Sequence, residues 1–252
     1  MEHYRHPFCT KVFIRVPFFR GFMKFLKFFS SLTKFEWCLW LFSLAGVLVC
    51  SILSPDFHLI GTLASLLGVT SLIFIAKGKW QGQILIVIFA TMYGIVSFEQ
   101  RYFGEMITYL CMTLPMAVIS LIAWFRHPYE KSDEVKINSL RPLHLAILLP
   151  ASAAVSVGLY FLLGALGTQN LLISTLSVTT SFFAASLTFL RTPYFALAYA
   201  VNDIVLITMW LMVALSTPAY FSMVICFSVF LVNDLYSFCN WMKMRKKQRA
   251  EL

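Results

Sequence analysis

The sequence has very little charge for its length. Of its 252 residues, 12% are Asp, Glu, Lys or Arg and 60% are hydrophobic, whereas a soluble domain typically carries about 25% charged residues. A water-soluble protein with so few charges would leave most of its surface apolar, but lipid tolerates apolar side chains that point outward. The composition therefore excludes an ordinary soluble domain and predicts an all-α polytopic membrane protein.

The sequence also lacks the common motifs of catalysis and metal binding. It contains no Walker A loop, no HExxH or GxSxG motif and no paired histidine cluster. Its six cysteines show no CxxC pair and no Cys/His ligand spacing, which favours free thiols over disulfides or a metal site. We therefore expect no enzymatic activity, no cofactor and no bound metal.

The net charge of +9 does not indicate nucleic-acid binding, because Lys and Arg occur in short clusters between long uncharged runs. The first 36 residues carry seven basic side chains and no signal-peptide cleavage site. Within them Arg20, Lys24, Lys27 and Lys34 recur at helical spacing. This pattern favours an amphipathic helix on the membrane surface, with a disordered basic tail as the alternative.

Eight apolar stretches are long enough, or nearly so, to cross a bilayer. Gly and Pro residues fall at or near most of their proposed ends, where helices start and stop. Pro115 and Pro150 lie inside spans, where neighbouring helices can satisfy the freed carbonyls. We place the spans at residues 37–54, 57–77, 81–99, 103–125, 143–166, 170–190, 193–216 and 218–242.

Basic residues predict the orientation of these spans. With the N-terminus inside, 19 of the 20 Lys and Arg residues lie on the cytoplasmic side and Arg101 alone lies outside. The positive-inside rule therefore predicts a multi-pass protein of the cell (inner) membrane with both termini in the cytoplasm.

Two segments share a pattern that indicates an internal repeat. Residues 102–124 and 220–241 both begin with Tyr-Phe and end with Trp, and each would be the last helix of a set of three. Three spans reverse the direction of the chain across the membrane, and one linking span restores it. The two sets would therefore be parallel, as in the SWEET-like 3+1+3 arrangement. The predicted segments are a basic amphipathic tail (1–36), an extra transmembrane helix (37–54), a first triple-helix repeat (57–125), a linker helix (143–166), a second triple-helix repeat (170–242) and a basic tail (243–252).

The polar pair Asn202-Asp203 is the most informative feature inside the spans. It lies about ten residues into the seventh span, near the bilayer midplane. An Asp at mid-helix costs about 2.5–3.5 kcal/mol on insertion scales, so such residues mark functional sites by default. The alternative is a hydrogen bond that joins two helices.

Other polar residues lie nearer the membrane surfaces. Asn233 and Asp234, close to Tyr236, precede the inner end of the last span and are candidate gating residues or partners of Arg191; snorkelling to the surface is the structural alternative. At the opposite end Gln100 lies close to Glu99 and Glu105 in the sequence. This group could collect a cation at an entrance, although solvated loop residues have the same composition.

Aromatic side chains offer a second kind of contact. Tyr93, Tyr109, Tyr199 and Trp210 lie deep in their spans, where a flat ligand would stack on them and a cationic ring would be held by their π faces. Packing between helices is the alternative for each. An interfacial aromatic belt explains the tryptophans near span ends, which are Trp37, Trp40, Trp80, Trp124 and Trp241.

Several of these motifs together resemble the PnuC family over residues 57–242. In the first triplet they are the stretch from Gly61 to Lys77, Tyr93-Gly94-Ile95, Tyr102-Phe103-Gly104 and Ala123-Trp124; in the second they are LRTPYFALAYAVND, from Leu190 to Asp203, and FLVNDLY, from Phe230 to Tyr236, followed by Trp241. The resemblance implies a carrier that takes up nicotinamide riboside, a vitamin B3 precursor of NAD, by facilitated diffusion. It also implies a cytoplasmic kinase that traps the product by phosphorylation.

The chain departs from the family at one motif. Many members carry a Trp-x-x-Trp pair seven and four residues before the signature Asn, and here those positions are Phe195 and Ala198. Tyr194 and Tyr199 lie beside them and are expected to take over the stacking. The predicted substrate-binding residues are Asn202, Asp203, Tyr199, Tyr194, Trp210, Tyr93, Tyr109 and Gln100, and the predicted gating residues are Asn233, Asp234 and Tyr236.

Three alternatives stay open at this point. The first is a related carrier of thiamine, riboflavin or a deoxynucleoside. The second is a carrier coupled to protons or sodium in which Asp203 titrates, and the third is a membrane scaffold or an intramembrane enzyme. The expected partners are a small-molecule substrate, the lipid bilayer and the kinase, without nucleic acid, and a homo-oligomer is left open.

Overall fold

The structure of the chain, a computed structural model, describes residues 28–53, 59–99, 106–130, 132–168, 170–216 and 221–251. The chain divides into two units, Met1–Cys38 and Leu39–Leu252. Eight helices of the described chain are long and apolar enough to cross a membrane, so the predicted all-α polytopic class is confirmed. They are α2 (Lys34–Leu53), α3 (Leu59–Ala76), α4 (Gln81–Glu99), η1 (Thr108–Thr113) continuing as α6 (Leu114–Arg126), α7 (Pro142–Ala165), α8 (Leu171–Phe189), α9 (Tyr194–Ser216) and α10 (Phe221–Ala250).

The first unit contributes the start of α2. Thr33 and Glu36 form a capping box: the Thr33 Oγ1 accepts the Glu36 backbone N–H at 3.2 Å, and Glu36 Oε2 accepts the Thr33 N–H at 2.6 Å. These bonds satisfy two N–H groups that a helix start leaves without partners, so α2 begins three residues before the predicted span. Most of the predicted surface helix lies outside the described residues.

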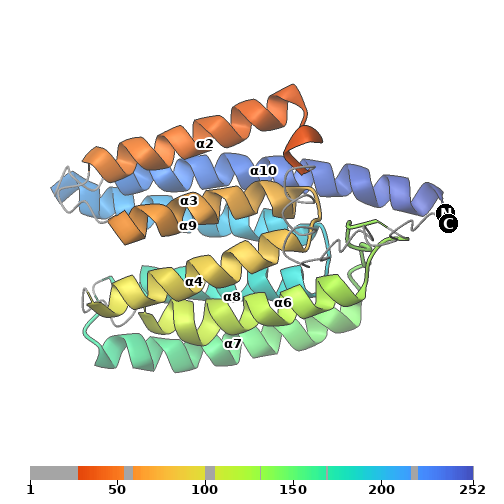
Figure 1. The fold of residues 1–252 in the computed structure, drawn as a ribbon. Helices are drawn as coiled ribbons and strands as arrows, with labels where there is room; N and C mark the ends of the chain where they lie inside the picture. Colours follow the sequence, from red (N-terminus) through yellow and green to blue (C-terminus); the bar gives the residue numbers. More distant parts are fainter. Residues whose placement is uncertain are drawn as a thin grey trace, which may run out of the picture. The chain divides into compact units, whose positions relative to one another are not determined.

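In the second unit, six helices pack side by side in a closed ring. Each helix packs against the next in the order α3, α4, α6, α8, α9 and α10, and α10 packs against α3 (Figure 1). The linker helix α7 packs against α8. The triplets α3–α4–α6 and α8–α9–α10 therefore make equivalent contacts, and the third helix of each touches the first helix of the other.

The part of α2 that belongs to the second unit is held by polar contacts. Asn233 of α10 donates a hydrogen bond from Nδ2 to Ser43 Oγ at 2.8 Å. Trp40 donates a hydrogen bond from Nε1 to Thr70 Oγ1 of α3 at 3.3 Å. Hydrogen bonds between transmembrane helices stabilise association because lipid offers no other partner. This extra helix is thus tied to the two helices where the ring closes.

The fourth span contains a stretch of π-helix. Residues Thr108–Thr113 form η1, directly before Pro115 in α6. Proline has no N–H to donate and its ring crowds the carbonyl four residues earlier, so a wider turn relieves the clash. We expected a membrane span to accept Pro115 in its interior, and the stretch of π-helix is the local distortion that accommodates this residue.

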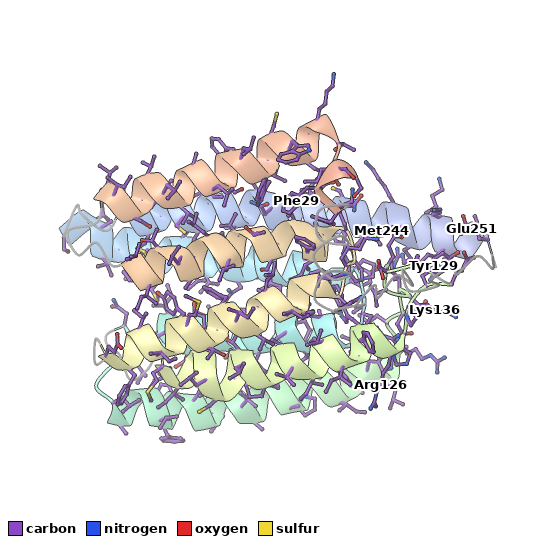
Figure 2. The ribbon with its side chains drawn as sticks, in the orientation of Figure 1. Phe29, Arg126, Tyr129, Lys136, Met244 and Glu251 are labelled. Atoms are coloured by element: carbon purple, nitrogen blue, oxygen red, sulfur yellow. The ribbon has the colours of Figure 1, made fainter. Side chains whose placement is uncertain are left out.

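A short polar segment, residues 127–141, connects α6 to α7 and is bound by the end of α10. Gln248 Oε1 accepts the Ile137 N–H at 2.9 Å, and Gln248 Nε2 donates to the Val135 carbonyl at 3.1 Å. Tyr129 donates to the Glu251 carboxylate, which raises the pKa of Tyr129 to about 12. Figure 2 shows Tyr129, Lys136 and Glu251 beside the end of α10.

The last helix extends past residue 242, where the predicted span ends and the predicted basic tail begins. Helix α10 continues to Ala250 because its last turns bind the connecting segment, and Gln248 is buried there. The same segment reaches the α3–α4 turn, where Val135 N–H donates to the Gly78 carbonyl at 2.9 Å and Lys79 lies 3.7 Å from Glu134. The end of the molecule that carries residues 127–141 is called the α10 end below.

Candidate functional site

A cavity of about 530 Å³ lies inside the ring of helices and receives side chains from all six. This volume is in the range of sites that bind small molecules, about 300–1,000 Å³. Most of the lining is apolar, as is usual for such sites, and a few polar side chains converge on it. It is the candidate functional site.

One face of α9 forms a wall of this cavity. The lining residues of α9 are Phe195, Tyr199, Asn202, Asp203, Leu206, Met209 and Trp210. They recur every three or four residues, with the adjacent pairs Asn202-Asp203 and Met209-Trp210, which places them on one side of an α-helix. Four of the predicted substrate-binding residues, Tyr199, Asn202, Asp203 and Trp210, therefore lie together.

Asn202 is fixed by the neighbouring helix α8. Its Oδ1 accepts hydrogen bonds from Thr180 Oγ1 at 2.7 Å and from Ser181 Oγ at 3.1 Å. Two hydroxyl partners from successive residues hold the amide in one orientation at the cavity wall. An amide held in this way is preorganised for a ligand, since little freedom remains to be lost on binding.

Asp203 and Asp234 bring two carboxyl groups to the same wall. Asp203 is 4% exposed and Asp234 of α10 is 7% exposed, both line the cavity, and the two helices that carry them pack against each other. Asp203 Oδ2 is buried and has no hydrogen-bond partner among the described residues. A buried acceptor of this kind is able to take a hydrogen bond or pair with a charge from a ligand in the cavity.

Gln83 of α4 is a polar residue that the sequence did not single out. It is buried, lines the cavity, and its Nε2 has no hydrogen-bond partner within the described chain. An amide of this kind can donate to a carbonyl or hydroxyl of a ligand. None of the described residues that line the cavity is Lys, Arg or His, so the lining described here carries acidic groups without basic ones.

Aromatic rings face the cavity from α4 and η1. Tyr93 and Tyr109 have ring centroids 4.5 Å apart, and Phe89 lies 5.7 Å from each of them. Gly94 permits this approach, because a β-carbon at that position would collide with Leu110 of η1. The predicted residues Tyr93 and Tyr109 thus form an aromatic cluster in the cavity lining.

Phe195 joins the cavity to a closed aromatic cluster at the α10 end. Its ring lines the cavity and lies 4.8 Å from the Trp241 ring and 6.4 Å from the Trp124 ring. Trp124 and Trp241 are 1% and 0% exposed. Both had been predicted for an interfacial belt, and burial between the triplets shows that this interpretation was wrong.

Three predicted site residues of the described ranges are not in the cavity lining, namely Tyr194, Asn233 and Tyr236. Tyr194 packs on Phe238 and lies under the Arg245 guanidinium, 5.7 Å from it, because it is one residue out of phase with the lining face. Asn233 faces Ser43 of α2, and Tyr236, which also lies on α10, does not line the cavity. Gln100 lies outside the described residues.

Asp234 lines the cavity, on the helix that packs against the helix of Asp203. Sequence position near the end of the last span suggested a gating role or a pair with Arg191, and the gating role stays a prediction. Within the described ranges, no group of His, Cys, Asp and Glu residues has the arrangement of a metal site.

The family model of the nicotinamide mononucleotide transporters matches residues 58–243. The chain belongs to this family. It is thus a membrane transporter, and the matched range contains all six ring helices and the cavity between them.

Two relatives of this family member carry names that agree with the assignment. The chain is 24% identical to the nicotinamide riboside transporter PnuC of Neisseria mucosa over 230 residues, which are 88% of this chain and 86% of the relative. It is 26% identical to the nicotinamide riboside transporter PnuC of Haemophilus influenzae over 197 residues, or 77% and 83% of the two chains. The resemblance to PnuC is confirmed.

A solved structure has the same fold. The crystal structure of the vitamin B3 transporter PnuC superposes with a TM-score of 0.70 at 24% identity, and the match covers 86% of this chain and 94% of the other. The likeness extends over nearly the whole of that chain, so the helix arrangement of this family member is that of PnuC.

Sequence signals existed for some of the residues that were missed. Phe195 stands at a position of the family's tryptophan pair, and Thr180 and Ser181 are adjacent hydroxyls in an apolar helix. Gln83 gave a weaker signal, because it lies near the start of its span, where polar residues are common.

Proposed function

We propose that this transporter takes up nicotinamide riboside across the cell (inner) membrane by facilitated diffusion. The names of the two relatives support this substrate. The cavity supports it through its chemistry: Asn202 and Gln83 offer amides for the carboxamide and ribose hydroxyls, and Tyr93 and Tyr109 offer rings for the flat base.

The observation that carries the proposal is the charge of the lining. The family is described as nicotinamide mononucleotide transporters, whereas the relatives are named nicotinamide riboside transporters. The mononucleotide differs from the riboside by one phosphate. A phosphate is normally held by Arg, Lys or helix N-termini. The described lining contains Asp203 and Asp234 and no basic residue, which favours the riboside.

The negative charge of the cavity also supports trapping of the phosphorylated substrate inside the cell. Facilitated diffusion only equalises the substrate concentration on the two sides, so net uptake requires a reaction that removes the substrate. A cytoplasmic kinase that phosphorylates the riboside would produce an anion, and two buried acids oppose the return of that anion through the same site.

We further propose that α3–α4–α6 and α8–α9–α10 are parallel repeats joined by α7 in the SWEET-like 3+1+3 order, with α2 as an extra helix. The equivalent contacts of the two triplets support this division. The basic residues support a cytoplasmic α10 end and cytoplasmic termini. The aromatic cluster of Phe195, Trp124 and Trp241 would then close the cavity towards the cytoplasm.

Thiamine is the second candidate substrate. The family's tryptophan pair is replaced by Phe195 and Ala198, and Phe195 lines the cavity floor. A changed stacking surface favours a ring system of another shape, and thiamine shares a positive charge with nicotinamide riboside.

The test is a calorimetric titration of the purified protein with nicotinamide riboside, nicotinamide mononucleotide, thiamine, riboflavin and deoxynucleosides. We expect nicotinamide riboside to bind and the mononucleotide to bind at least about tenfold more weakly, which is ~1.4 kcal/mol. Asn202→Ala should weaken binding of the riboside by at least about tenfold, because its amide would be lost. Tight binding of another vitamin in place of the riboside would assign the cavity to that vitamin.

A further inference from the structure

Two aspartates are the charged residues inside the ring of helices. Between Phe221 and Trp241, α10 contains Asp234 alone among Asp, Glu, Lys and Arg; α9 contains only Asp203, and α8 and α3 contain none. In α4 and the η1–α6 span the charged residues, Glu99 and Arg126, are terminal. The two acids therefore have no cationic side chain near the middle of these helices.

The two carboxyl groups are arranged so that they carry one negative charge together. They are buried in the lining of one cavity, on two helices that pack against each other, and two adjacent buried carboxylates do not ionise at the same time, because like charges repel strongly away from water. One proton shared by Asp203 and Asp234 leaves a single charge. Asp203 Oδ2, buried and without a described partner, is the acceptor that remains for a ligand.

The other groups that face the pair are neutral. Tyr199 on α9 lines the same cavity, and α8 contributes the hydroxyls of Ser177, Ser181 and Thr188 to it. The opposite side of the cavity presents the rings of Tyr93 and Tyr109. Aromatic faces attract cations and carboxylates pair with them, so both walls favour the same kind of ligand.

We propose that Asp203 and Asp234 act as one counter-ion that selects singly cationic rings over neutral or anionic molecules of the same shape. This inference rests on the proposed function and narrows its substrate class. A pyridinium or thiazolium ring satisfies the single charge, and a loaded site is then neutral. Flavins and deoxynucleosides leave the charge buried without a partner and are disfavoured.

The test uses two forms of one ligand. Oxidised nicotinamide riboside carries a pyridinium charge, whereas dihydronicotinamide riboside has one hydride more and is neutral. The affinity of the purified full chain for each is measured by calorimetry at neutral pH, together with thiamine and riboflavin. We expect the oxidised form to bind at least about tenfold more tightly than the reduced form, or ~1.4 kcal/mol.

Variants separate charge from shape. The double variant Asp203→Asn with Asp234→Asn should reduce the ratio of the two affinities to less than about threefold, whereas Asp203→Asn alone should retain most of it, because Asp234 then still carries the single charge. Glu130→Gln changes an exposed acid of the connecting segment, outside the cavity, and should leave the ratio unchanged. Thermal unfolding in the same detergent identifies a variant that does not fold, and the double substitution of both aspartates by Ser is then used in place of the double Asn variant.

The outcomes distinguish this inference from the proposed function. Equal binding of the two forms by the wild-type chain, or a ratio that survives in the double variant Asp203→Asn with Asp234→Asn, overturns the counter-ion and leaves the riboside as substrate. Binding of thiamine without the riboside overturns the proposed substrate and supports the counter-ion. Binding of riboflavin alone, or of none of the four ligands, overturns both.

Discussion

The indole rings of Trp124 and Trp241 lie against each other between the two helix triplets, with centroids 5.2 Å apart. Each ring is bonded to the opposite triplet. Trp124 Nε1 donates to the Thr188 carbonyl of α8 at 2.9 Å, and Trp241 Nε1 donates to the Ile75 carbonyl of α3 at 2.8 Å. The last helix of each triplet thus caps the end of the first helix of the other.

This reciprocal pair predicts that substitutions of Trp124 and Trp241, which are far apart in the sequence, lower the stability of the protein equally. Trp124→Phe and Trp241→Phe each remove one hydrogen bond to a carbonyl that keeps a backbone donor, the Arg191 N–H or the Gly78 N–H, and such a loss costs about 0.5–1.5 kcal/mol. We expect a similar fall in Tm for both variants in thermal unfolding. The effects of the double variant should not add, because the two rings are in contact. A large effect of one substitution and none of the other would contradict the equivalence of the triplets.

Helix packing at the α3–α4 contact depends on Gly82. A β-carbon at this position would lie 2.9 Å from the backbone nitrogen of Ile75, which a side-chain rotation cannot relieve. Gly82→Ala should therefore destabilise the protein by about 1–3 kcal/mol. Gly158 of α7 is the matched control, since a β-carbon there meets nothing within 4 Å. The measurement is thermal unfolding of both variants, and equal stabilities would contradict the close contact.

The aromatic cluster in the cavity predicts a loss of binding without loss of fold. Tyr93→Ala removes a ring that lines the cavity and packs on Tyr109. We expect about tenfold weaker binding of nicotinamide riboside, because stacking on a flat cationic ring is lost. Tyr160→Ala removes a ring of α7 outside the cavity lining and should leave the affinity unchanged. Equal affinities of all three proteins would place the ligand elsewhere.

The basic residues predict the side of the membrane on which each connection lies. Green fluorescent protein fused after Leu252 should fluoresce, because that reporter folds in the cytoplasm, and alkaline phosphatase fused after Thr168 should be active, because that connection faces outside. Fusions are compared in intact cells at matched expression. An active phosphatase at the C-terminus would reverse the assigned orientation.

The sequence predicted the spans well because lipid imposes a length on each helix. Span α4 begins and ends at the predicted residues 81 and 99, and most other ends differ by a few residues. The end of α10 was wrong by eight residues. Its last turns are polar and lie beyond the apolar run, and contacts of Gln248 with a segment more than 100 residues away keep them helical.

The site was only partly visible in the sequence. Asn202 and Asp203 were accessible because polar residues in the middle of a span are rare. The proximity of Asp203 to Asp234 could not be predicted from the sequence, because it depends on the packing of α9 on α10. Tyr194 was placed in the site wrongly, although its helical phase with respect to Tyr199 already argued against it.

Trp124 and Trp241 show a general limit of this kind of prediction. A tryptophan near a span end has the same sequence context whether it faces the lipid interface or the neighbouring triplet. Closure of the helix ring decides between the two, and that closure follows from contacts between α6 and α8 and between α10 and α3. No local pattern carries this information.

The most direct test of the central claim is counterflow of radiolabelled nicotinamide riboside into proteoliposomes preloaded with the unlabelled compound. Purified wild-type protein should produce a transient accumulation of label without ATP or an ion gradient, and Asn202→Ala should reduce its initial rate at least about tenfold. Label that enters wild-type proteoliposomes no faster than protein-free liposomes would contradict the assignment of this cavity as a path for nicotinamide riboside.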